Sequence, residues 1–456
     1  MNGYLNESNF LMVEEGFTTR DLLENILGEL CQENEQQAFF VADLGDIVKK
    51  HLRFLKALPR VKPYFPVKCN SSEGVIRLLA ELGAGFACAN KAEISRVQGI
   101  GVPADRIFYS SPCKQVAHIR YAATHGVRLM AFDNEVELSK VARSHPRARL
   151  LLGITADSIP SAHPSMAFGS TLKSCRHLLE TAKEQAVEVV GISFYLGSRG
   201  LEPQALAQAV AAAQLVFDMG TELGHHMHLL DIGGGFPGTE DTRVLLEEIA
   251  AGINSALDLY FPEGSGVDII ARPGRYYVTS AFTLAVSITA LEEIPMEQPG
   301  SDGRCDSRML MASTVPSAAS CSTAPVPGPG CTRSPTPCPA WPEHPWHSSS
   351  LRGPQGHGED RIADGLELPL LHVGDWLVFG NMGAYTMPTS SLLTAGPKPQ
   401  VTYAMSRMAW KAIQLFQGKP LQTEDDRESL CTPLSCGWEM AETLCVTPVF
   451  APAGII

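Results

Sequence analysis

Residues 268–280 read DIIARPGRYYVTS, an apolar run that changes abruptly into a polar loop containing glycine. Asp268 to Ala271 have the composition of a buried strand. Gly274 and Arg275 are typical of a loop that binds an anion through backbone amides and a guanidinium group. Between the two parts stands Arg272, whose permanent charge must be tolerated at the strand's last position. The stretch therefore predicts a strand that delivers anion-binding groups to a site.

Seven similar apolar runs precede this one, and longer segments with helical spacing lie between them. The eight runs are Tyr64–Lys68, Gly85–Cys88, Arg106–Tyr109, Leu129–Phe132, Leu150–Ile154, Val189–Tyr195, Leu229–Ile232 and Asp268–Ala271. Near-continuous apolar strands that alternate with helices indicate a parallel sheet covered on both faces. Eight such units over roughly 200 residues predict a closed (β/α)8 barrel of the TIM type, in which the loops after the strands carry any chemistry.

Strand-like segments follow the barrel and predict a C-terminal β domain. They are Ala281–Leu291, Trp376–Phe379 and Val401–Met405. We therefore expect an N-terminal segment over 1–42 that partly joins the β domain, a barrel over 43–281, and a β domain over 282–456. Residues 304–358 interrupt the last domain, because PVPGPGCTRSPTPCPAWPEHPW (325–346) has too much Pro, Gly, Ser and Cys to pack into a sheet. The expectation there is a disordered surface insertion.

Composition and charge exclude several classes of function. The net charge of −13 argues against general binding to nucleic acid or acidic membranes. No apolar run approaches the ~20 residues that span a bilayer, and Met1 to Glu15 lack the pattern of an export signal. Twelve cysteines without a CxxC spacing predict reduced thiols in the cytosol. His225, His226 and His228 have no partner at ligand spacing, so we expect no metal site.

Six motifs occur together and in order. They are YFPVKCNSS (64–72), GISFYLGS (191–198), DIGGGFPG (231–238), RPGRYYVTSAFTLAVSI (272–288), HVGDWLVFGNMGAYT (372–386) and LSCGWE (434–439). With them the chain resembles the eukaryotic ornithine decarboxylases and their non-catalytic relatives, the antizyme inhibitors. MVEEGFTTRDLL (12–23) and ETLCVTPVFAPAGII (442–456) favour the antizyme-inhibitor branch. The likeness covers almost everything except about 304–346.

The resemblance implies a site for pyridoxal phosphate at the mouth of the barrel. In the decarboxylases a lysine forms a Schiff base with this cofactor, and Lys68 matches it. The residues that match the phosphate site are Ser198, Gly233, Gly234, Gly235, Arg275 and Tyr385. Read from the residues alone, the three glycines also fit a tight turn after a strand, and Lys68 a lysine that extends from a strand end to solvent.

Arg272 is the main departure from the decarboxylase pattern. The family places a glutamate against the pyridine nitrogen, which keeps the ring protonated and able to accept electrons. A guanidinium is always charged and only donates hydrogen bonds, so it opposes decarboxylation. Alanine racemases, which share this barrel type, carry an arginine at the equivalent position. Arg272 by itself therefore does not exclude binding of the cofactor.

Further departures fall on groups that act together in the decarboxylases. Tyr195 replaces a histidine that stacks on the ring, Ala87 an aspartate, and Gly153 an arginine, although Glu93 is retained. Glu359 replaces the cysteine of a Cys-Asp pair supplied across a dimer interface, which leaves Asp360. Pro66, two residues before Lys68, removes a backbone donor from a central strand. We therefore predict no catalytic residues, a vestigial site that keeps Lys68 and Asp360, and no bound cofactor, because losing several cooperating groups abolishes a reaction.

The irregular segment also lacks the family's substrate-binding aspartate. Where the family carries Asp-Gly-Val-Tyr-Gly, this chain reads Met311 to Val315, a pentapeptide that a one-nucleotide shift of those codons can produce. Residues 304–346 are therefore either a real insertion or the product of a frame-shifted exon or gene-model error. The transcript sequence distinguishes the two.

The resemblance also implies a binding surface for antizyme, the small protein that binds ornithine decarboxylase and directs it to the proteasome. KQVAHIRYAATHGVRLMAFDNEVELSK (114–140) matches the family's antizyme-binding element and is locally basic, which suits an acidic partner. The residues expected to contact antizyme are Lys114, Gln115, Arg120, Tyr121, Thr124, His125 and Lys140. Charge alone favours an ordinary barrel helix with solvated side chains.

Three hypotheses follow. The chain is an antizyme inhibitor that spares ornithine decarboxylase and raises polyamine synthesis and uptake, a residual pyridoxal-phosphate decarboxylase of ornithine or arginine in putrescine biosynthesis, or an inert product of a damaged gene. The first is preferred. It implies antizymes as partners, no nucleic acid and no direct membrane insertion, and a monomer or weak homodimer. The resemblance places it in the cytoplasm, associated with ER–Golgi membranes and vesicles.

Overall fold

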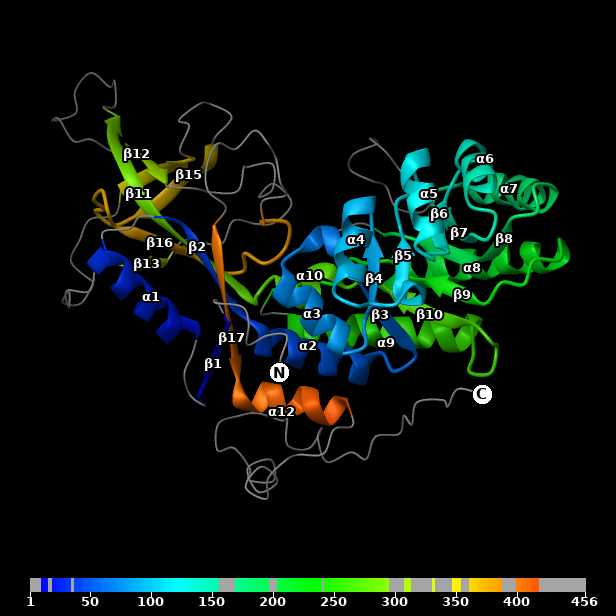
Figure 1. Cartoon of the computed structure of the whole chain (residues 1–456), viewed down its shortest axis with the longest axis horizontal. Coiled ribbons are helices and arrows are strands. Elements are labelled where there is room, and N and C mark those ends of the chain that lie inside the picture. The colour runs from blue at the N-terminus through cyan, green and yellow to red at the C-terminus, as the bar shows by residue number, and fades with distance from the viewer. Residues whose placement is uncertain are drawn as a thin grey trace.

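The computed structural model describes eleven segments of the chain. They are residues 10–14, 19–33, 37–155, 169–196, 203–239, 242–294, 307–312, 330–332, 347–353, 361–387 and 399–417. Within them, no helix combines the length and the apolar character needed to span a membrane. Two β structures, a barrel and an open sheet, lie at opposite ends of the molecule (Figure 1).

Eight parallel strands close into a barrel, which confirms the predicted (β/α)8 architecture. The strands are β3 (Val61–Pro66), β4 (Gly85–Cys88), β5 (Ile107–Tyr109), β6 (Leu129–Phe132), β7 (Arg149–Ile154), β8 (Glu188–Phe194), β9 (Leu229–Asp231) and β10 (Asp268–Ala271). β10 pairs with β3 and closes the ring. Several expected strand ends differ from the structure, and two of them affect residues of the predicted site. β3 stops at Pro66, so Lys68 lies in the short helix η1 (Val67–Cys69), and Arg272 follows β10 instead of ending it.

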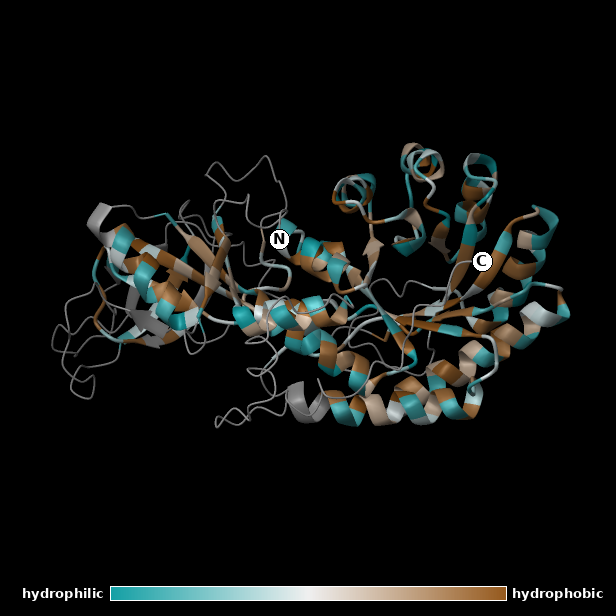
Figure 2. Cartoon of the chain, turned by 60° about the horizontal axis from the view of Figure 1, so that its bottom comes forward, coloured by the Kyte–Doolittle hydropathy of each residue, from teal (hydrophilic) through white to brown (hydrophobic). Residues whose placement is uncertain are grey.

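Helices surround the barrel because each presents one apolar face to the strands (Figure 2). They are α2 (Leu44–Ala57), α3 (Glu73–Glu81), α4 (Lys91–Gly99), α5 (Val116–Thr124), α6 (Glu135–Ser144), α7 (Leu172–Glu184), α8 (Pro203–Glu222) and α9 (Thr242–Tyr260), with the short η2 (Ala104–Arg106) and α10 (Gly274–Val278). The barrel interior is a separate cluster of buried side chains, made of Ala87, Phe108, Ala131, Leu151, Val190 and Ile270. The barrel is therefore a packed core, and its loops are free to form a site.

The second β structure is a sheet to which both ends of the described chain contribute. Its members are β1 (Phe10–Val13), β2 (Phe39–Asp43), β11 (Phe282–Ile294), β12 (Ser307–Ala312), β13 (Gly330–Thr332), β14 (His347–Arg352), β15 (Arg361–Leu368), β16 (Trp376–Phe379) and β17 (Gln400–Ser406). Helices α1 (Thr19–Glu33) and α12 (Arg407–Phe416) accompany it. The N-terminal strands β1 and β2 flank β17, so residues before the barrel join the sheet that follows it.

The expectation that residues 304–358 stay outside any sheet was wrong for part of that segment. Strand β12 pairs with β11, and β14 pairs with both β12 and β15. The short β13 pairs with β16. Sequence composition averaged over the whole segment concealed these strands, because Ser307–Ala312 and His347–Arg352 are short and lie beside long Pro-, Gly- and Ser-rich sequence. In the structure both pair with neighbouring strands.

The sheet and the barrel are joined by backbone hydrogen bonds close to the barrel mouth. The amide of Asp43, which ends β2, donates to Ala281 O at 2.8 Å. The amide of Gly383 donates to Thr279 O at 3.1 Å, and that of Tyr385 donates to Cys69 O at 2.8 Å. These bonds hold the segment that follows β16 against the loops after β3 and β10, so the second structure supplies one wall of the site.

Candidate functional site

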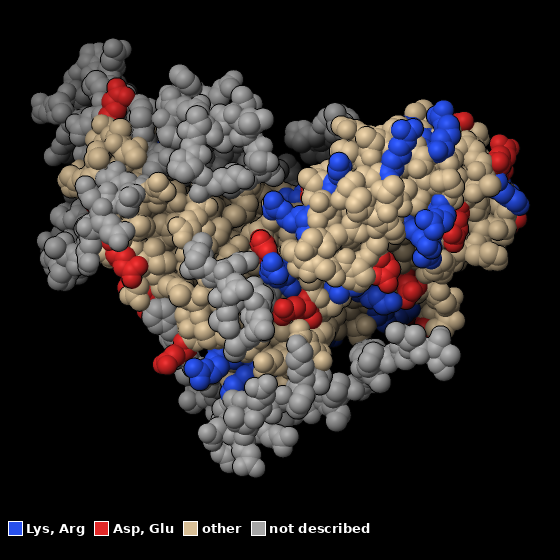
Figure 3. Space-filling model, in the orientation of Figure 1, with Lys and Arg blue, Asp and Glu red and all other residues tan. Residues whose placement is uncertain are grey.

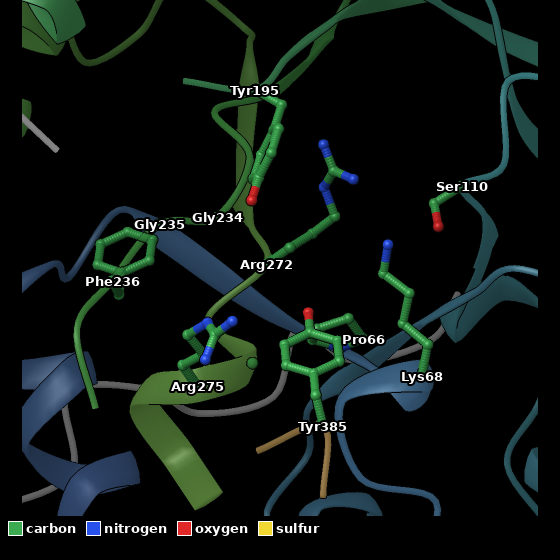
Figure 4. Close-up of a pocket in the computed structure, with 11 residues that line it drawn as sticks. Pro66, Lys68, Ser110, Tyr195, Gly234, Gly235, Phe236, Arg272, Arg275 and Tyr385 are labelled. Atoms are coloured by element: carbon green, nitrogen blue, oxygen red, sulfur yellow. The ribbon is translucent and has the colours of Figure 1, made fainter. Parts of the chain in front are cut away.

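A pocket of about 140 Å³ opens where the barrel strands end. Its walls come from segments that follow β3, β5, β8, β9, β10 and β16 (Figure 4). The lining residues are Pro66, Lys68, Ser110, Tyr195, Gly234, Gly235, Phe236, Arg272, Gly274, Arg275 and Tyr385. The pocket thus lies at the end of the barrel where loop chemistry was expected.

The glycine-rich loop after β9 adopts a backbone that only glycine tolerates. Gly233 has a φ of +75°, and a Cβ added there would lie 2.3 Å from Phe194 O. A Cβ on Gly234 would lie 2.7 Å from Arg272 O. The loop is also tied to the segment after β10, because the Arg272 amide donates to Gly233 O at 2.6 Å. Such a loop lets backbone amides approach an anion closely.

Arg275 and Tyr385 form the wall on the side of the pocket away from Tyr195 (Figure 4). The Arg275 guanidinium carbon lies 4.8 Å from the centre of the Tyr385 ring. Tyr385 has a φ of +62°, a rare conformation for a residue with a side chain, and the hydrogen bond that its amide donates to Cys69 O holds it there. Burial raises the pKa of Tyr385, so its hydroxyl keeps its proton and can donate to a bound oxygen.

Lys68 extends into the pocket from η1 (Figure 4). Partial desolvation in the pocket lowers the pKa of its amine, and the nearby charge of Arg272 lowers it further.

Glu93, which is also retained from the family pattern, has a clear structural role. Its carboxylate accepts hydrogen bonds from the Ala89 amide at 2.7 Å and from Asn90 Nδ2 at 2.8 Å, while Asn90 caps the Glu93 amide. This reciprocal arrangement fixes the start of α4.

Arg272 forms an ion pair with a buried carboxylate of the neighbouring strand. Its Nε lies 3.0 Å from Asp231 Oδ2, and Asp231 is fully buried. Asp231 also accepts hydrogen bonds from Ser193 Oγ at 2.8 Å and from the Gly233 amide at 2.9 Å. The buried carboxylate therefore has three partners, one of them a cation. Sequence analysis did not identify Asp231 as the partner that allows a charge at this position.

The pocket has groups that suit the phosphate of pyridoxal phosphate, but it lacks an acceptor for a protonated nitrogen of the pyridine ring. The glycine loop, the Arg275 guanidinium and the Tyr385 hydroxyl form a donor set suited to a phosphate group. Where the decarboxylases keep a carboxylate for the ring nitrogen, this chain presents Arg272, which has only donors and is already paired with Asp231. Figure 4 shows Arg272 extending between Tyr195 and Lys68. The residues present do not favour a protonated pyridine ring.

Most of the residues predicted for this site come together. Lys68, Gly234, Gly235, Arg275 and Tyr385 line the pocket, and Gly233 begins its loop. The predicted Ser198 and Asp360, together with Glu359, lie outside the described residues. Ser110 lines the pocket but was missed. It is the first residue after β5, and a polar residue directly after a barrel strand is the signal that would have found it.

The residues predicted to bind antizyme lie on α5, its flanks and α6. Gln115, Arg120, Thr124 and His125 are exposed, and Tyr121 is half-buried. The Tyr121 and His125 rings stack with centroids 3.8 Å apart, and the Lys91 ammonium lies 4.9 Å from the Tyr121 ring centre. Lys and Arg side chains gather over this side of the barrel (Figure 3). These side chains are available to a partner.

Lys114 does not fit the prediction that it contacts a partner. Its ammonium is fully buried, 2.7 Å from Glu137 Oε1, and it donates to Ala131 O at 2.5 Å. Glu137 also contacts the Lys140 ammonium at 2.5 Å, and Lys140 donates to Lys114 O at 2.7 Å. Lys114, Glu137 and Lys140 thus form a charge cluster, of which Lys140 alone is partly exposed.

Within the described residues, no three His, Cys, Asp or Glu side chains are grouped to hold a metal ion.

The (β/α)8 barrel and the glycine-rich loop after β9, which suits a phosphate group, are typical of one class of protein, the pyridoxal-phosphate barrels. The family model for the pyridoxal-binding domain of pyridoxal-dependent decarboxylases matches residues 44–279. Among solved structures, arginine decarboxylase of Paramecium bursaria Chlorella virus, bound to agmatine, superposes with a TM-score of 0.75 at 29% identity. That match covers 85% of this chain and all of the viral one.

Curated relatives narrow the class. Antizyme inhibitor 2 of Homo sapiens is 55% identical over 466 aligned positions, with complete coverage of both chains. Ornithine decarboxylase of Mus musculus is 48% identical and covers 94% of each chain. The chain belongs to the ornithine decarboxylase family, and it is similar over its whole length to the antizyme inhibitors within that family.

Proposed function

We propose that this protein is an antizyme inhibitor without decarboxylase activity. It binds and sequesters antizyme, spares ornithine decarboxylase from degradation, and so raises polyamine synthesis and uptake. The main support is its full-length similarity to proteins named antizyme inhibitor 2, combined with the ion pair between Arg272 and Asp231 at the ring end of the pocket. On this proposal the protein acts in the cytoplasm, associated with ER–Golgi membranes, and has antizymes as partners.

The proposed loss of catalysis follows from the chemistry of Arg272. Pyridoxal phosphate, when bound, accepts the electrons released by decarboxylation, and it does so best with a protonated ring nitrogen. An arginine cannot accept the hydrogen bond that such a nitrogen donates, and its charge disfavours protonation next to it. Because Asp231 is already committed to Arg272, Ser193 and Gly233, it does not replace the missing carboxylate.

The proposed partner surface is supported by local charge. Residues 113–147 contain six Lys and Arg against three Asp and Glu, in a chain with a net charge of −13. Lys114 and Glu137 are buried together, so five of the six basic residues and two of the three acidic ones lie outside this buried pair. The surface of α5 and α6 is therefore basic and suits an acidic partner through steering and rim contacts.

Residual decarboxylation is the second candidate function, and the retained half of the pocket favours it. Lys68 faces the pocket with a lowered pKa, and Arg275 and the glycine loop are in place. An absorbance scan with added pyridoxal phosphate tests this candidate. A band that forms on Lys68, disappears in Lys68→Ala and shifts with ornithine would support the enzyme, and a featureless scan supports the antizyme inhibitor.

A pull-down with purified antizyme tests the proposed function and separates it from an inert product. The wild-type chain should retain antizyme, and Arg120→Glu should retain less because it reverses an exposed charge on α5. The matched control is Arg20→Glu on α1, where the arginine side chain is 82% exposed. No retention by wild-type protein, or equal losses in both variants, contradicts the proposal.

A further inference from the structure

The pocket at the barrel mouth is lined by basic residues and by no carboxylate. Lys68, Arg272 and Arg275 are basic, and all its other lining residues are neutral. Among the residues that the structure describes, nothing forms a hydrogen bond or an ion pair with the Lys68 amine or the Arg275 guanidinium. Cations that gather in a concave site without counter-charges attract an anion. The pocket therefore suits a negatively charged ligand.

The end of the pocket beside Arg275 suits a phosphate group. The Arg275 guanidinium is a charged fork of donors, and the glycine loop after β9 lets backbone amides approach an anion. The Tyr385 hydroxyl keeps its proton because burial raises its pKa, so it can donate as well. These donors recognise a phosphate whatever the rest of the ligand is, and they set no requirement for a pyridine ring.

The opposite end of the pocket also consists of donors. Figure 4 shows the Lys68 amine pointing toward the Arg272 guanidinium and the Ser110 hydroxyl. Arg272 directs its Nε to Asp231 at 3.0 Å, and a guanidinium has further N–H donors besides that one. The Ser110 hydroxyl has only a long contact, 3.4 Å, with Cys88 O. This end can therefore donate several hydrogen bonds to a second anionic group.

The electrostatics of Lys68 indicate a missing negative charge at this end. Desolvation lowers the pKa of the Lys68 amine most, and the Arg272 charge lowers it more than the Glu93 carboxylate raises it. Glu93 already accepts hydrogen bonds from the Ala89 amide and from Asn90. An anion bound between Lys68 and Arg272 would relieve their repulsion and raise the pKa of Lys68 again.

A ligand that matches both ends carries two anionic groups. Pyridoxal phosphate has its ring nitrogen away from the phosphate, where the pocket offers donors and no free acceptor. We propose that the pocket binds a phosphorylated carboxylic acid, with the phosphate beside Arg275 and the carboxylate between Lys68 and Arg272. Neither antizyme nor a decarboxylase takes part, so this binding goes beyond the proposed function and is independent of it.

Isothermal titration calorimetry of the full-length protein tests this assignment with two pairs of probes. Each pair compares an acid with the alcohol that has a hydroxymethyl group in place of the carboxylate. The pairs are 3-phosphoglycerate with glycerol 3-phosphate, and 4-phosphoerythronate with erythritol 4-phosphate. In at least one pair the acid should bind about tenfold more tightly than the alcohol, because its carboxylate gains charge-assisted hydrogen bonds.

Substitutions at the two ends of the pocket should have different effects. Lys68→Met should remove most of the preference for the acid and leave the affinity for the alcohol nearly unchanged, because it deletes a cation at the carboxylate end. Arg275→Met should weaken acid and alcohol alike, since both carry the phosphate. Lys62→Met is the matched control, because Lys62 on β3 is 66% exposed and does not line the pocket. Lys68→Met and Lys62→Met should melt at the wild-type temperature.

Labelling of Lys68 with acetic anhydride gives an independent readout. A bound acid covers the Lys68 amine and raises its pKa, so the acid that binds should slow labelling of Lys68 and leave Lys62 unaffected. The assignment is wrong if neither acid binds more tightly than its alcohol, if Lys68→Met keeps the preference, or if the bound acid leaves the Lys68 rate unchanged. In each of these cases the proposed function stands.

Discussion

Two residues of the pocket, Arg272 and Asp231, carry most of the chemical argument. The buried Asp231 carboxylate pairs with the Arg272 guanidinium and accepts hydrogen bonds from a hydroxyl and a backbone amide. This ion pair is the reason why a permanent charge is tolerated directly after β10. Paired in this way, neither group is available as the acceptor that a protonated pyridine nitrogen requires. Relative to the decarboxylase pattern, Arg272 thus places a donor where the family has an acceptor, and it supplies an ion pair with Asp231.

Removing Arg272 should destabilise the protein. Arg272→Met leaves the Asp231 charge buried with two hydrogen bonds and no counter-ion, and we expect the free energy of unfolding to fall by about 2 kcal/mol, less than for a fully buried pair because Arg272 is 19% exposed. Urea denaturation measures this change. The double variant Arg272→Met/Asp231→Asn should recover much of the loss, and a double variant as unstable as the single one would show that the ion pair is not the cause.

Lys68 should react with acetic anhydride at a lower pH than an ordinary surface lysine. Its pKa is lowered by desolvation and by Arg272, so a larger fraction of the amine is neutral near pH 8. Arg272→Met removes a positive neighbour, raises the pKa of Lys68, and should slow the labelling. Mass spectrometry of labelled peptides gives the rates, with Lys62, whose side chain is 66% exposed, as the reference lysine. Equal rates at Lys68 and Lys62 across the pH range would contradict the lowered pKa.

At the scale of single residues, sequence predicted the pocket better than the partner surface. Lys68, Arg275 and Tyr385 could be found because each belongs to a motif whose residues keep their spacing. The partners of Arg272 and Lys114 could not, since Asp231 is 41 positions from Arg272 and Glu137 is 23 positions from Lys114. A basic residue in a basic stretch suggests an exposed charge, and only the fold shows that Lys114 is buried.

Among the elements, the loop after β9 depends on glycine at a defined position. Gly233→Ala adds a Cβ within 2.3 Å of Phe194 O in a left-handed backbone, and should lower the free energy of unfolding by about 2 kcal/mol. Gly99→Ala in α4 is the control, because nothing lies within 4 Å of its added Cβ and alanine favours helix. Thermal or urea unfolding of both variants checks the prediction, which fails if Gly233→Ala is as stable as Gly99→Ala.

The stability of the protein should depend on Glu137, the single carboxylate of the charge cluster that joins α5 and α6. Glu137→Gln leaves the Lys114 ammonium buried without a counter-charge, and should cost about 3–5 kcal/mol in the free energy of unfolding. Lys114→Met/Glu137→Gln removes the buried charge together with its partner and should recover part of that cost. Urea denaturation of the wild type, the single variant and the double variant measures these differences. A Glu137→Gln variant with wild-type stability would contradict the role given to Glu137.

The elements differ in how well the sequence predicts them. All eight barrel strands were predicted because each is a short apolar run bounded by turns, a pattern that local sequence carries by itself. Strands β12, β13 and β14 were missed because the segment was judged by its average composition, in which Pro, Gly and Ser conceal short strands such as the apolar Ser307–Ala312. Each of them pairs with a neighbouring strand. The strand end at Pro66 was also missed, since Val67 continues the apolar run past the proline before Lys68 interrupts it.

The whole molecule combines a retained enzyme scaffold with a basic helix pair on an acidic chain. The sheet supplies Tyr385 to the pocket through the segment after β16, while α5 and α6 stand on the barrel wall away from the sheet (Figure 1). The pocket and the proposed antizyme-binding surface therefore occupy different parts of the barrel. A protein can therefore keep the partner surface while its pocket loses catalytic activity, as the proposed function requires.

Release of ¹⁴CO₂ from labelled ornithine, in a mixture of ornithine decarboxylase and antizyme titrated with this protein, addresses the proposed function at the scale of the whole molecule. Antizyme should suppress the decarboxylase, and added protein should restore ¹⁴CO₂ release in proportion to the antizyme it binds. The same protein without ornithine decarboxylase should release none. Failure to restore activity, or release by this protein alone that Lys68→Ala abolishes, would contradict an antizyme inhibitor without catalysis.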